Sequence, residues 1–220
     1  MTIKVKLLFY QNILAMKKFL MMVAVAMMTA VSANAQSESN MWVKPMVGGT
    51  LTTITKIQDS KMKLGLVAGA EFGYHVIEPL AITGGLLVSM QGTKAKDNPL
   101  MQDFSWTTTY LNIPILANYY IVKGLAIKAG IQPGFLLSSK AKYQENKGGL
   151  WVDFENTSTD NMKKFDLSIP MGLSYEFSNF VIDARYNLGL MKIAKDSESF
   201  TDGDAKNSVI MLTVGYKIPL

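Results

Sequence analysis

Residues 165–177, FDLSIPMGLSYEF, alternate strictly between two kinds of side chain. Every odd position is apolar and every even position is small or polar. Successive side chains point to opposite faces of a β-strand, whereas a helix repeats about every 3.6 residues, so this stretch predicts a strand with one apolar face. Thirteen residues are more than the 5–6 usual in soluble sheets. They are enough to cross a bilayer at a tilt of about 45°.

The same alternation recurs along the chain. We expect further strands around 42–54, 64–74, 80–90, 111–119, 125–137, 180–190 and 210–220. With residues 165–177 this makes eight strands, an even number suited to a closed antiparallel sheet with both ends on one side. The predicted fold class is therefore all-β, an eight-stranded antiparallel up-and-down transmembrane β-barrel.

The connections between these strands alternate in length. Residues 76–79, 122–124 and 178–179 predict tight turns, and residues 55–62, 93–106, 140–162 and 194–207 predict long loops. Short turns at one rim and long loops at the other are typical of outer-membrane barrels. The loop at 140–162 contains Tyr143, Trp151 and Phe154, and we expect it to form an external contact surface.

The less apolar face decides which side of the sheet is outside. A soluble barrel presents that face to water and would carry many Lys and Glu residues. Here it is mostly Gly, Ser, Thr, Ala and Asn, which suit a narrow lumen filled by side chains. Its charged residues are few and of mixed sign, and we expect them to form an internal ion-pair network. They are Glu71, Lys128, Asp166, Glu176, Asp183 and Arg185.

Aromatic residues stand at the strand ends next to the tight turns. In a membrane barrel such residues form a girdle at the membrane interface. The expected girdle consists of Tyr74, Tyr119, Tyr175, Phe177, Phe180 and Tyr216.

The N-terminal segment has the parts of a secretory signal peptide. Lys17 and Lys18 precede an apolar run over residues 19–31, and small residues stand at Ala33 and Ala35. We expect cleavage between Ala35 and Gln36, which makes 1–35 the signal peptide and 36–220 the barrel domain. Met16 is an alternative start, because a second basic-apolar stretch precedes it.

The positive charge of the chain also lies in this segment. The 220 residues contain 22 Lys+Arg and 17 Asp+Glu, but residues 1–35 hold four of the lysines and no acid. The rest of the chain is nearly neutral and gives no sign of a basic surface that would bind nucleic acid. The absence of Cys excludes disulfides and thiolate metal sites.

No catalytic or cofactor motif emerges from the remaining residues. His75 is the single histidine and falls beside a predicted turn at the inner rim, with no Ser and Asp placed to work with it. There is no phosphate-binding loop and no metal-ligand spacing. We expect no enzyme activity, no cofactor and no metal.

Several short motifs resemble the outer-membrane β-barrel domain family of the Bacteroidota, often labelled porin-like or PorT-type. They are Gly73-Tyr74, Glu78-Pro79-Leu80, the run 110–114, the run Gly130 to Gly134, the run 172–176, Ala184-Arg185-Tyr186 and Gly215-Tyr216-Lys217. The resemblance implies a Gram-negative outer-membrane location and recognition by the barrel-assembly machinery. Family members usually end in an aromatic residue, so recognition here is expected to use Leu212, Val214, Tyr216, Ile218 and Leu220.

The sequence therefore predicts a monomeric, non-enzymatic protein embedded in outer-membrane lipid, with a side-chain-filled lumen and a structural or interaction role in its external loops. The loop partner is not specified. One alternative is a soluble periplasmic lipocalin-like barrel that encloses a lipid. Others are a narrow pore and, from the PorT-type label alone, an accessory of a secretion system.

Overall fold

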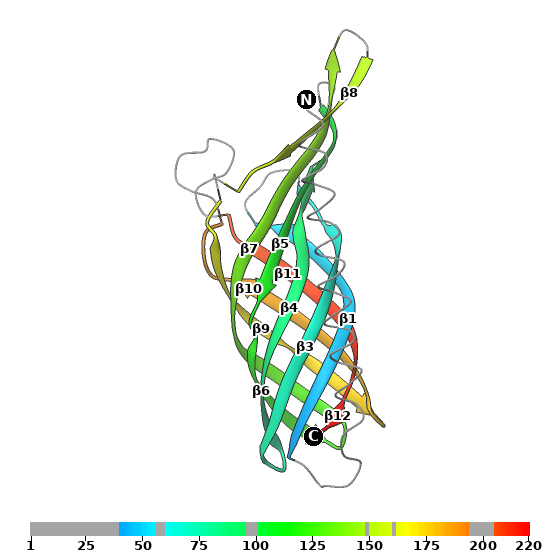
Figure 1. Cartoon of the computed structure of the whole chain (residues 1–220), viewed down its shortest axis with the longest axis vertical. Coiled ribbons are helices and arrows are strands. Elements are labelled where there is room, and N and C mark those ends of the chain that lie inside the picture. The colour runs from blue at the N-terminus through cyan, green and yellow to red at the C-terminus, as the bar shows by residue number, and fades with distance from the viewer. Residues whose placement is uncertain (1–39, 56–59, 96–100, 148–149, 160–161, 194–204) are drawn as a thin grey trace.

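The computed structural model describes residues 40–55, 60–95, 101–147, 150–159, 162–193 and 205–220, and these form one antiparallel sheet (Figure 1). The signal peptide expected at 1–35 and its cleavage site lie outside the described residues. The strands are β1 (Met41–Ile54), β2 (Ser60–Lys61), β3 (Lys63–Ile77), β4 (Leu80–Ala95), β5 (Met101–Asn112), β6 (Ile115–Val122), β7 (Leu125–Lys147), β8 (Leu150–Thr157), β9 (Phe165–Phe177), β10 (Phe180–Gly189), β11 (Asn207–Tyr216) and β12 (Ile218–Pro219).

The sheet closes on itself. Neighbouring strands pair in the order β11, β10, β9, β7, β5, β4, β3, β1, and β1 pairs again with β11 from Met46↔Gly215 to Ile54↔Asn207. β5 and β6 both lie between β4 and β7 and together occupy one position in the wall. The ring of about eight antiparallel strands confirms the predicted fold class.

The division between β5 and β6 falls at Ile113-Pro114, inside one strand predicted over 111–119. Proline has no N–H to donate to a strand ladder. The Pro114 carbonyl still accepts a hydrogen bond from the Gly85 N–H at 3.0 Å, and the Ile113 N–H donates to the Pro133 carbonyl at 2.8 Å. The wall therefore stays hydrogen-bonded across the interruption.

The two rims differ as the sequence predicts. At one rim two-residue turns join β3 to β4, β6 to β7 and β9 to β10. Gly124 (φ 85°) and Ser178 (φ 53°) occupy left-handed backbone positions in the last two of these turns. The strand ends that the longer connections join lie at the opposite rim (Figure 1). Because this rim carries the long loops, we call it the outer rim and the other the inner rim.

The apolar face of the sheet lies outside. Val47, Leu66 and Leu173 are 62%, 65% and 51% exposed, whereas the residues directly before and after each of them are more buried. A lipocalin-like barrel needs the opposite arrangement, so that alternative is wrong. The six aromatic residues expected to form the girdle are all exposed and lie near the inner rim. No helix among the described residues is long and apolar enough to span a membrane.

Two connections predicted as loops contain strand instead. Within 93–106, β4 extends to Ala95 and β5 begins at Met101. Within 140–162, β7 continues to Lys147 and pairs with β8 from Lys140↔Thr157 to Lys147↔Leu150. Figure 1 shows this hairpin rising past the other strands. Outside a bilayer neither face of a strand must be apolar, so strict alternation is lost there while the ladder hydrogen bonds persist.

Candidate functional site

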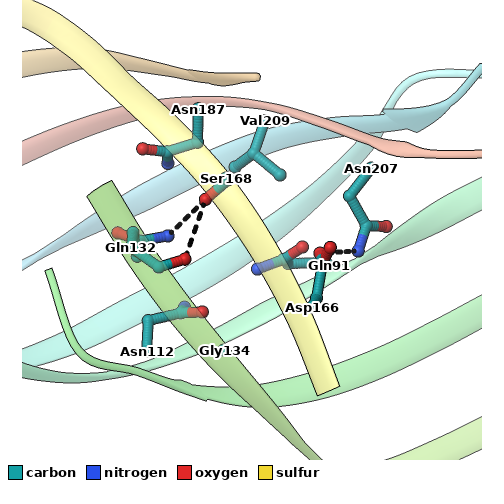
Figure 2. A pocket seen from close by; sticks show the side chains of 9 residues that line it. All are labelled: Gln91, Asn112, Gln132, Gly134, Asp166, Ser168, Asn187, Asn207 and Val209. Carbon is teal, nitrogen blue, oxygen red and sulfur yellow. Dashed lines mark hydrogen bonds between the residues drawn. The ribbon is translucent and has the colours of Figure 1, made fainter. Parts of the chain in front are cut away.

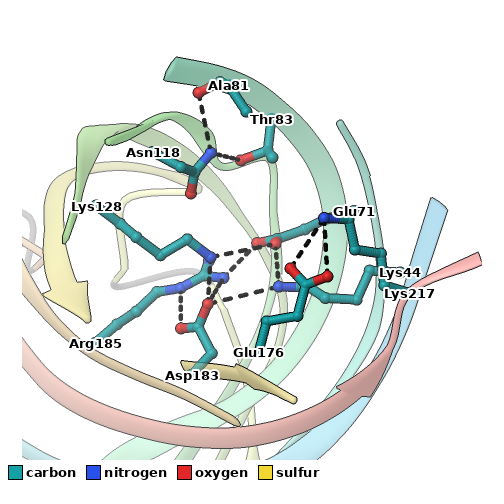
Figure 3. A network of polar contacts seen from close by, with 10 residues as sticks. All are labelled: Lys44, Glu71, Ala81, Thr83, Asn118, Lys128, Glu176, Asp183, Arg185 and Lys217. Carbon is teal, nitrogen blue, oxygen red and sulfur yellow. Dashed lines mark hydrogen bonds and ion pairs between the residues drawn. The ribbon is translucent and has the colours of Figure 1, made fainter. Parts of the chain in front are cut away.

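Five charged side chains meet inside the inner half of the barrel (Figure 3). Lys44 comes from β1, Glu71 from β3, Lys128 from β7, and Asp183 and Arg185 from β10. Each occupies an inward position of its strand, and none is more than 6% exposed. The period of two places Asp183 and Arg185 on the same face of β10.

The contacts within this cluster are short and shared. Arg185 donates to Asp183 through Nε at 2.6 Å and Nη2 at 2.8 Å, and Nη2 lies 2.6 Å from Oε1 of Glu71. Lys44 Nζ lies 2.9 Å from Oε2 of Glu71 and 3.5 Å from Oδ2 of Asp183. Lys128 Nζ donates to the same oxygen of Asp183.

These five residues, the ion-pair cluster, carry three positive and two negative charges. Buried charges are tolerated when they are paired and become costly when a partner is removed. Each carboxylate contacts more than one cation, so the cluster is held from four separate strands. It fills the lumen with fixed charge.

The structure brings together four of the six residues expected to form a lumen network. Asp166 and Glu176 lie elsewhere, one deeper toward the outer rim and one at the inner rim. Lys44 belongs to the cluster but was missed. Its signal was present, since Val43 and Val47 are apolar and share one face of the strand predicted around 42–54, and Lys44 falls between them on the opposite face.

Asp166 lies in a second layer of the lumen, which is rich in side-chain amides (Figure 2). Its carboxylate accepts hydrogen bonds from the Leu167 N–H and from Nδ2 of Asn207, both at 2.8 Å. Four more amides line the same cavity, and we call them with Asp166 and Asn207 the amide layer. They are Gln91, Asn112, Gln132 and Asn187.

Apolar side chains close the lumen on the outer side of the amide layer. One buried cluster consists of Ile54, Tyr110, Leu136, Met162, Ile193 and Ala205. Trp106 packs against this cluster, and its indole N–H donates to Ser139 Oγ at 2.9 Å. Met46, Val67, Leu87 and Met211 form a smaller apolar cluster farther inward.

At the inner rim Glu176 pairs with Lys217 rather than with the ion-pair cluster. Lys217 Nζ donates to both carboxylate oxygens, at 2.9 and 3.1 Å, and lies 5.0 Å from the centre of the Trp42 ring. With His75 these residues line a cavity of about 210 Å³. The imidazole of His75 lies 5.3 Å from the Tyr120 ring, and its backbone N–H donates to the Asn40 carbonyl.

The other residues singled out from the sequence are those of the cleavage site and of the C-terminal assembly signal. Ala35 and Gln36 are outside the described residues. Leu212, Val214 and Tyr216 are exposed on the outer face of β11, Leu220 is exposed, and Ile218 in β12 is half-buried.

A closed antiparallel barrel with an apolar outer face and a polar, side-chain-filled lumen defines an integral outer-membrane protein. A family model described as "Outer membrane protein beta-barrel domain" matches residues 25–195. The chain belongs to this family, which places it in the outer membrane.

Solved outer-membrane barrels are similar to this chain at low sequence identity. Ail, the attachment invasion locus protein of Yersinia pestis, is 18% identical, with 82% of this chain and 99% of that chain covered and a TM-score of 0.47. Neisserial surface protein A is 15% identical, with 84% and 100% covered and a TM-score of 0.39. The N-terminal β-barrel domain of Pseudomonas aeruginosa OprF is 15% identical, with 81% and 98% covered and a TM-score of 0.29. A search of curated proteins finds no match.

Proposed function

We propose that this protein is a monomeric, non-enzymatic outer-membrane barrel that acts through its external hairpin, with a lumen that does not conduct. It is made with a signal peptide over 1–35 that is removed after Ala35, and it is inserted by the barrel-assembly machinery through its C-terminal strand. The motifs quoted from the sequence support a Bacteroidota origin.

The observation that carries this proposal is the hairpin formed by β7 and β8 beyond the barrel. Leu150, Trp151 and Val152 expose 73%, 40% and 39% of their surface there, on a hairpin that rises past the other strands (Figure 1). Exposed apolar residues gathered on one element mark interaction surfaces. Among the described residues β8 pairs with β7 alone, so its outer edge is open to a partner strand.

The hairpin is built to hold this surface in place. Tyr143 and Phe154 face each other across the two strands and stack at 5.4 Å between ring centres. Glu155 pairs with Lys140 at 2.8 Å and with Lys142 at 2.9 Å. These cross-strand contacts stabilise an ordered projection. With Lys140, Lys142 and Glu155 paired to one another, the hairpin favours a protein partner with an apolar patch over a highly charged polymer.

The filled lumen argues against a transport function and favours a function in binding at the hairpin. An eight-stranded barrel leaves an interior that side chains nearly fill. Here an apolar cluster, the amide layer and the ion-pair cluster succeed one another along the axis. We therefore expect planar-bilayer recordings to show no stable conductance, and a steady open channel would contradict the sealed lumen.

The barrel itself is tested by electrophoresis of the outer-membrane fraction with and without boiling. Closed membrane barrels resist unfolding by SDS, so unheated protein migrates at a different position. Trypsin added to intact cells should cut the hairpin at Lys140 or Lys142 and leave the barrel whole. Protein that is released in the soluble fraction and shows no heat-dependent shift would refute the membrane assignment.

The role of the hairpin is tested with a variant that changes only its exposed apolar residues. Leu150→Ser, Trp151→Ser and Val152→Ser together keep the backbone ladder and remove the apolar surface. Cells with this variant should lose attachment to the protein partner, and competitive fitness, to the same extent as cells lacking residues 144–158. A matched control, Leu66→Ser, removes an apolar residue from the lipid face of β3 instead. Unchanged attachment in both hairpin variants would end the proposal.

A further inference from the structure

The amide layer encloses a cavity of about 10 Å³ between the outer apolar cluster and the ion-pair cluster. A volume of about 10–15 Å³ on this measure holds one water-sized sphere. The cavity is therefore too small for a sugar, a peptide or a lipid chain. Only a single water molecule or a monatomic ion fits it.

The hydrogen bonds around the cavity consume donors and leave acceptors unused. The amide nitrogens of Gln91 and Asn112 both donate to Ser89 Oγ, at 2.9 and 2.8 Å, and that of Gln132 donates to Ser168 Oγ at 3.3 Å. The amide oxygens of Gln91 and Gln132 accept no hydrogen bond from a described residue.

Asn187 adds a third free amide oxygen and one free amide nitrogen. All three side chains are at least 95% buried, at 5%, 3% and 2% exposure for Gln91, Gln132 and Asn187. A buried polar atom without a partner costs free energy unless a ligand or water meets it. Acceptors outnumber donors three to one among these free atoms, so the cavity suits a positive ligand.

Asp166 supplies a negative charge to the same cavity. It is 7% exposed, and its partners are an amide nitrogen and a backbone N–H, both neutral. No described lysine or arginine forms an ion pair with it. Lys44, Lys128 and Arg185 are engaged with Glu71 and Asp183 instead. Buried charges in proteins are normally paired or bound to a metal ion.

We propose that the amide layer binds one monovalent inorganic cation such as Na⁺, held by the carboxylate of Asp166 and the amide oxygens of Gln91, Gln132 and Asn187. Carboxylate and amide oxygens are ligands that hard cations prefer. A single positive charge neutralises Asp166, whereas a divalent ion would leave an uncompensated buried charge. A water molecule donates two protons and leaves both the third acceptor and the carboxylate charge unmet.

The test compares the purified full-length barrel, folded in detergent micelles, in NaCl and in choline chloride at equal ionic strength. Choline is too large for the cavity. We expect the apparent unfolding temperature to be higher in NaCl by about 3–6 °C if Na⁺ exceeds its dissociation constant tenfold. Titration followed by ²³Na NMR line broadening should saturate and should be reversed by excess K⁺ or Li⁺ that competes for the site.

Asp166→Asn should abolish the salt-specific stabilisation and the saturable broadening. Gln132→Met removes one ligand oxygen and should weaken Na⁺ binding about tenfold while the barrel still folds, so the proposal is testable even if the Asp166 variant does not fold. Glu155→Gln removes an exposed carboxylate on the hairpin and should change neither readout.

Three results would overturn the proposal. Equal unfolding temperatures in NaCl and choline chloride between pH 5 and 8 would show that a proton or a water molecule alone satisfies Asp166. Broadening that survives in Asp166→Asn, or that disappears in Glu155→Gln, would place Na⁺ elsewhere on the molecule.

Discussion

Charge imbalance in the ion-pair cluster predicts that its members differ sharply in their effect on stability. The cluster holds three cations and two carboxylates, so it carries one excess positive charge. Lys128→Met leaves a neutral set in which Asp183 keeps Arg185 at 2.6 Å and Lys44 at 3.5 Å. Asp183→Asn leaves three buried cations facing Glu71 alone.

The magnitudes follow from this arrangement. Removing one partner of a buried ion pair costs about 3–5 kcal/mol when the other charge is left uncompensated. We expect that loss in the free energy of unfolding for Asp183→Asn. Lys128→Met leaves no charge uncompensated and puts an apolar chain of similar volume in place of the lysine, so we expect a change below about 1 kcal/mol.

The double variant provides the decisive comparison. Combining Lys128→Met with Asp183→Asn lowers the excess charge from two to one, so the double variant should be more stable than Asp183→Asn alone. Urea unfolding of the barrel in lipid vesicles, followed by tryptophan fluorescence and by the gel shift, measures all three variants. If Lys128→Met costs as much as Asp183→Asn, or if the two losses simply add, charge balance does not govern the cluster.

Two other predictions concern a tight wall position and the hairpin. A Cβ at Gly73 would clash with the ring of the buried Trp42, so Gly73→Ala should shift tryptophan emission and cost about 1–3 kcal/mol. Gly84→Ala meets no atom within 4 Å and should have no effect. On the hairpin, hydrogen bonds from lysines, chiefly Lys140, lower the pKa of Glu155. The stabilising contribution of ionised Glu155 is present at neutral pH and is lost as the pH falls through the lowered pKa. Carboxyl ¹³C NMR should show that the pKa of Glu155 returns toward its normal value in Lys140→Gln.

Much of the wall was predictable from the sequence because its two faces meet different environments. Lipid requires apolar residues outside, and a narrow lumen requires small or polar residues inside, so the period of two survives along each spanning strand. The strand predicted from residues 165–177 coincides with β9. The short turns at Glu78-Pro79, Lys123-Gly124 and Ser178-Asn179 are confirmed as well.

The hairpin was not predictable by the same reasoning. Above the membrane both faces of β7 and β8 meet water, and the apolar residues Leu150, Trp151 and Val152 are consecutive rather than alternating. The ladder hydrogen bonds that define these strands involve only the backbone. Composition therefore resembled that of a loop.

The periodicity of the sequence also could not predict which lumen charges lie together. Periodicity says that Asp166 and Asp183 both point inward, but their height along the barrel depends on the stagger between strands. In the structure Asp183 lies opposite Ser174, eight residues along β9 from Asp166. The two carboxylates therefore belong to different layers.

The length of β7 has a mechanical consequence. Its 23 residues run from the inner rim to the tip of the hairpin, about 75 Å at 3.3 Å per residue. A partner that pulls on the hairpin away from the cell loads the backbone bonds between β7 and its neighbours β5, β6 and β9 in shear, many at once, rather than opening them one by one. Because β8, which carries the proposed contact surface, pairs with β7 along its whole length, tension on β8 would pass through β7 to the barrel wall, without a flexible joint among the described residues.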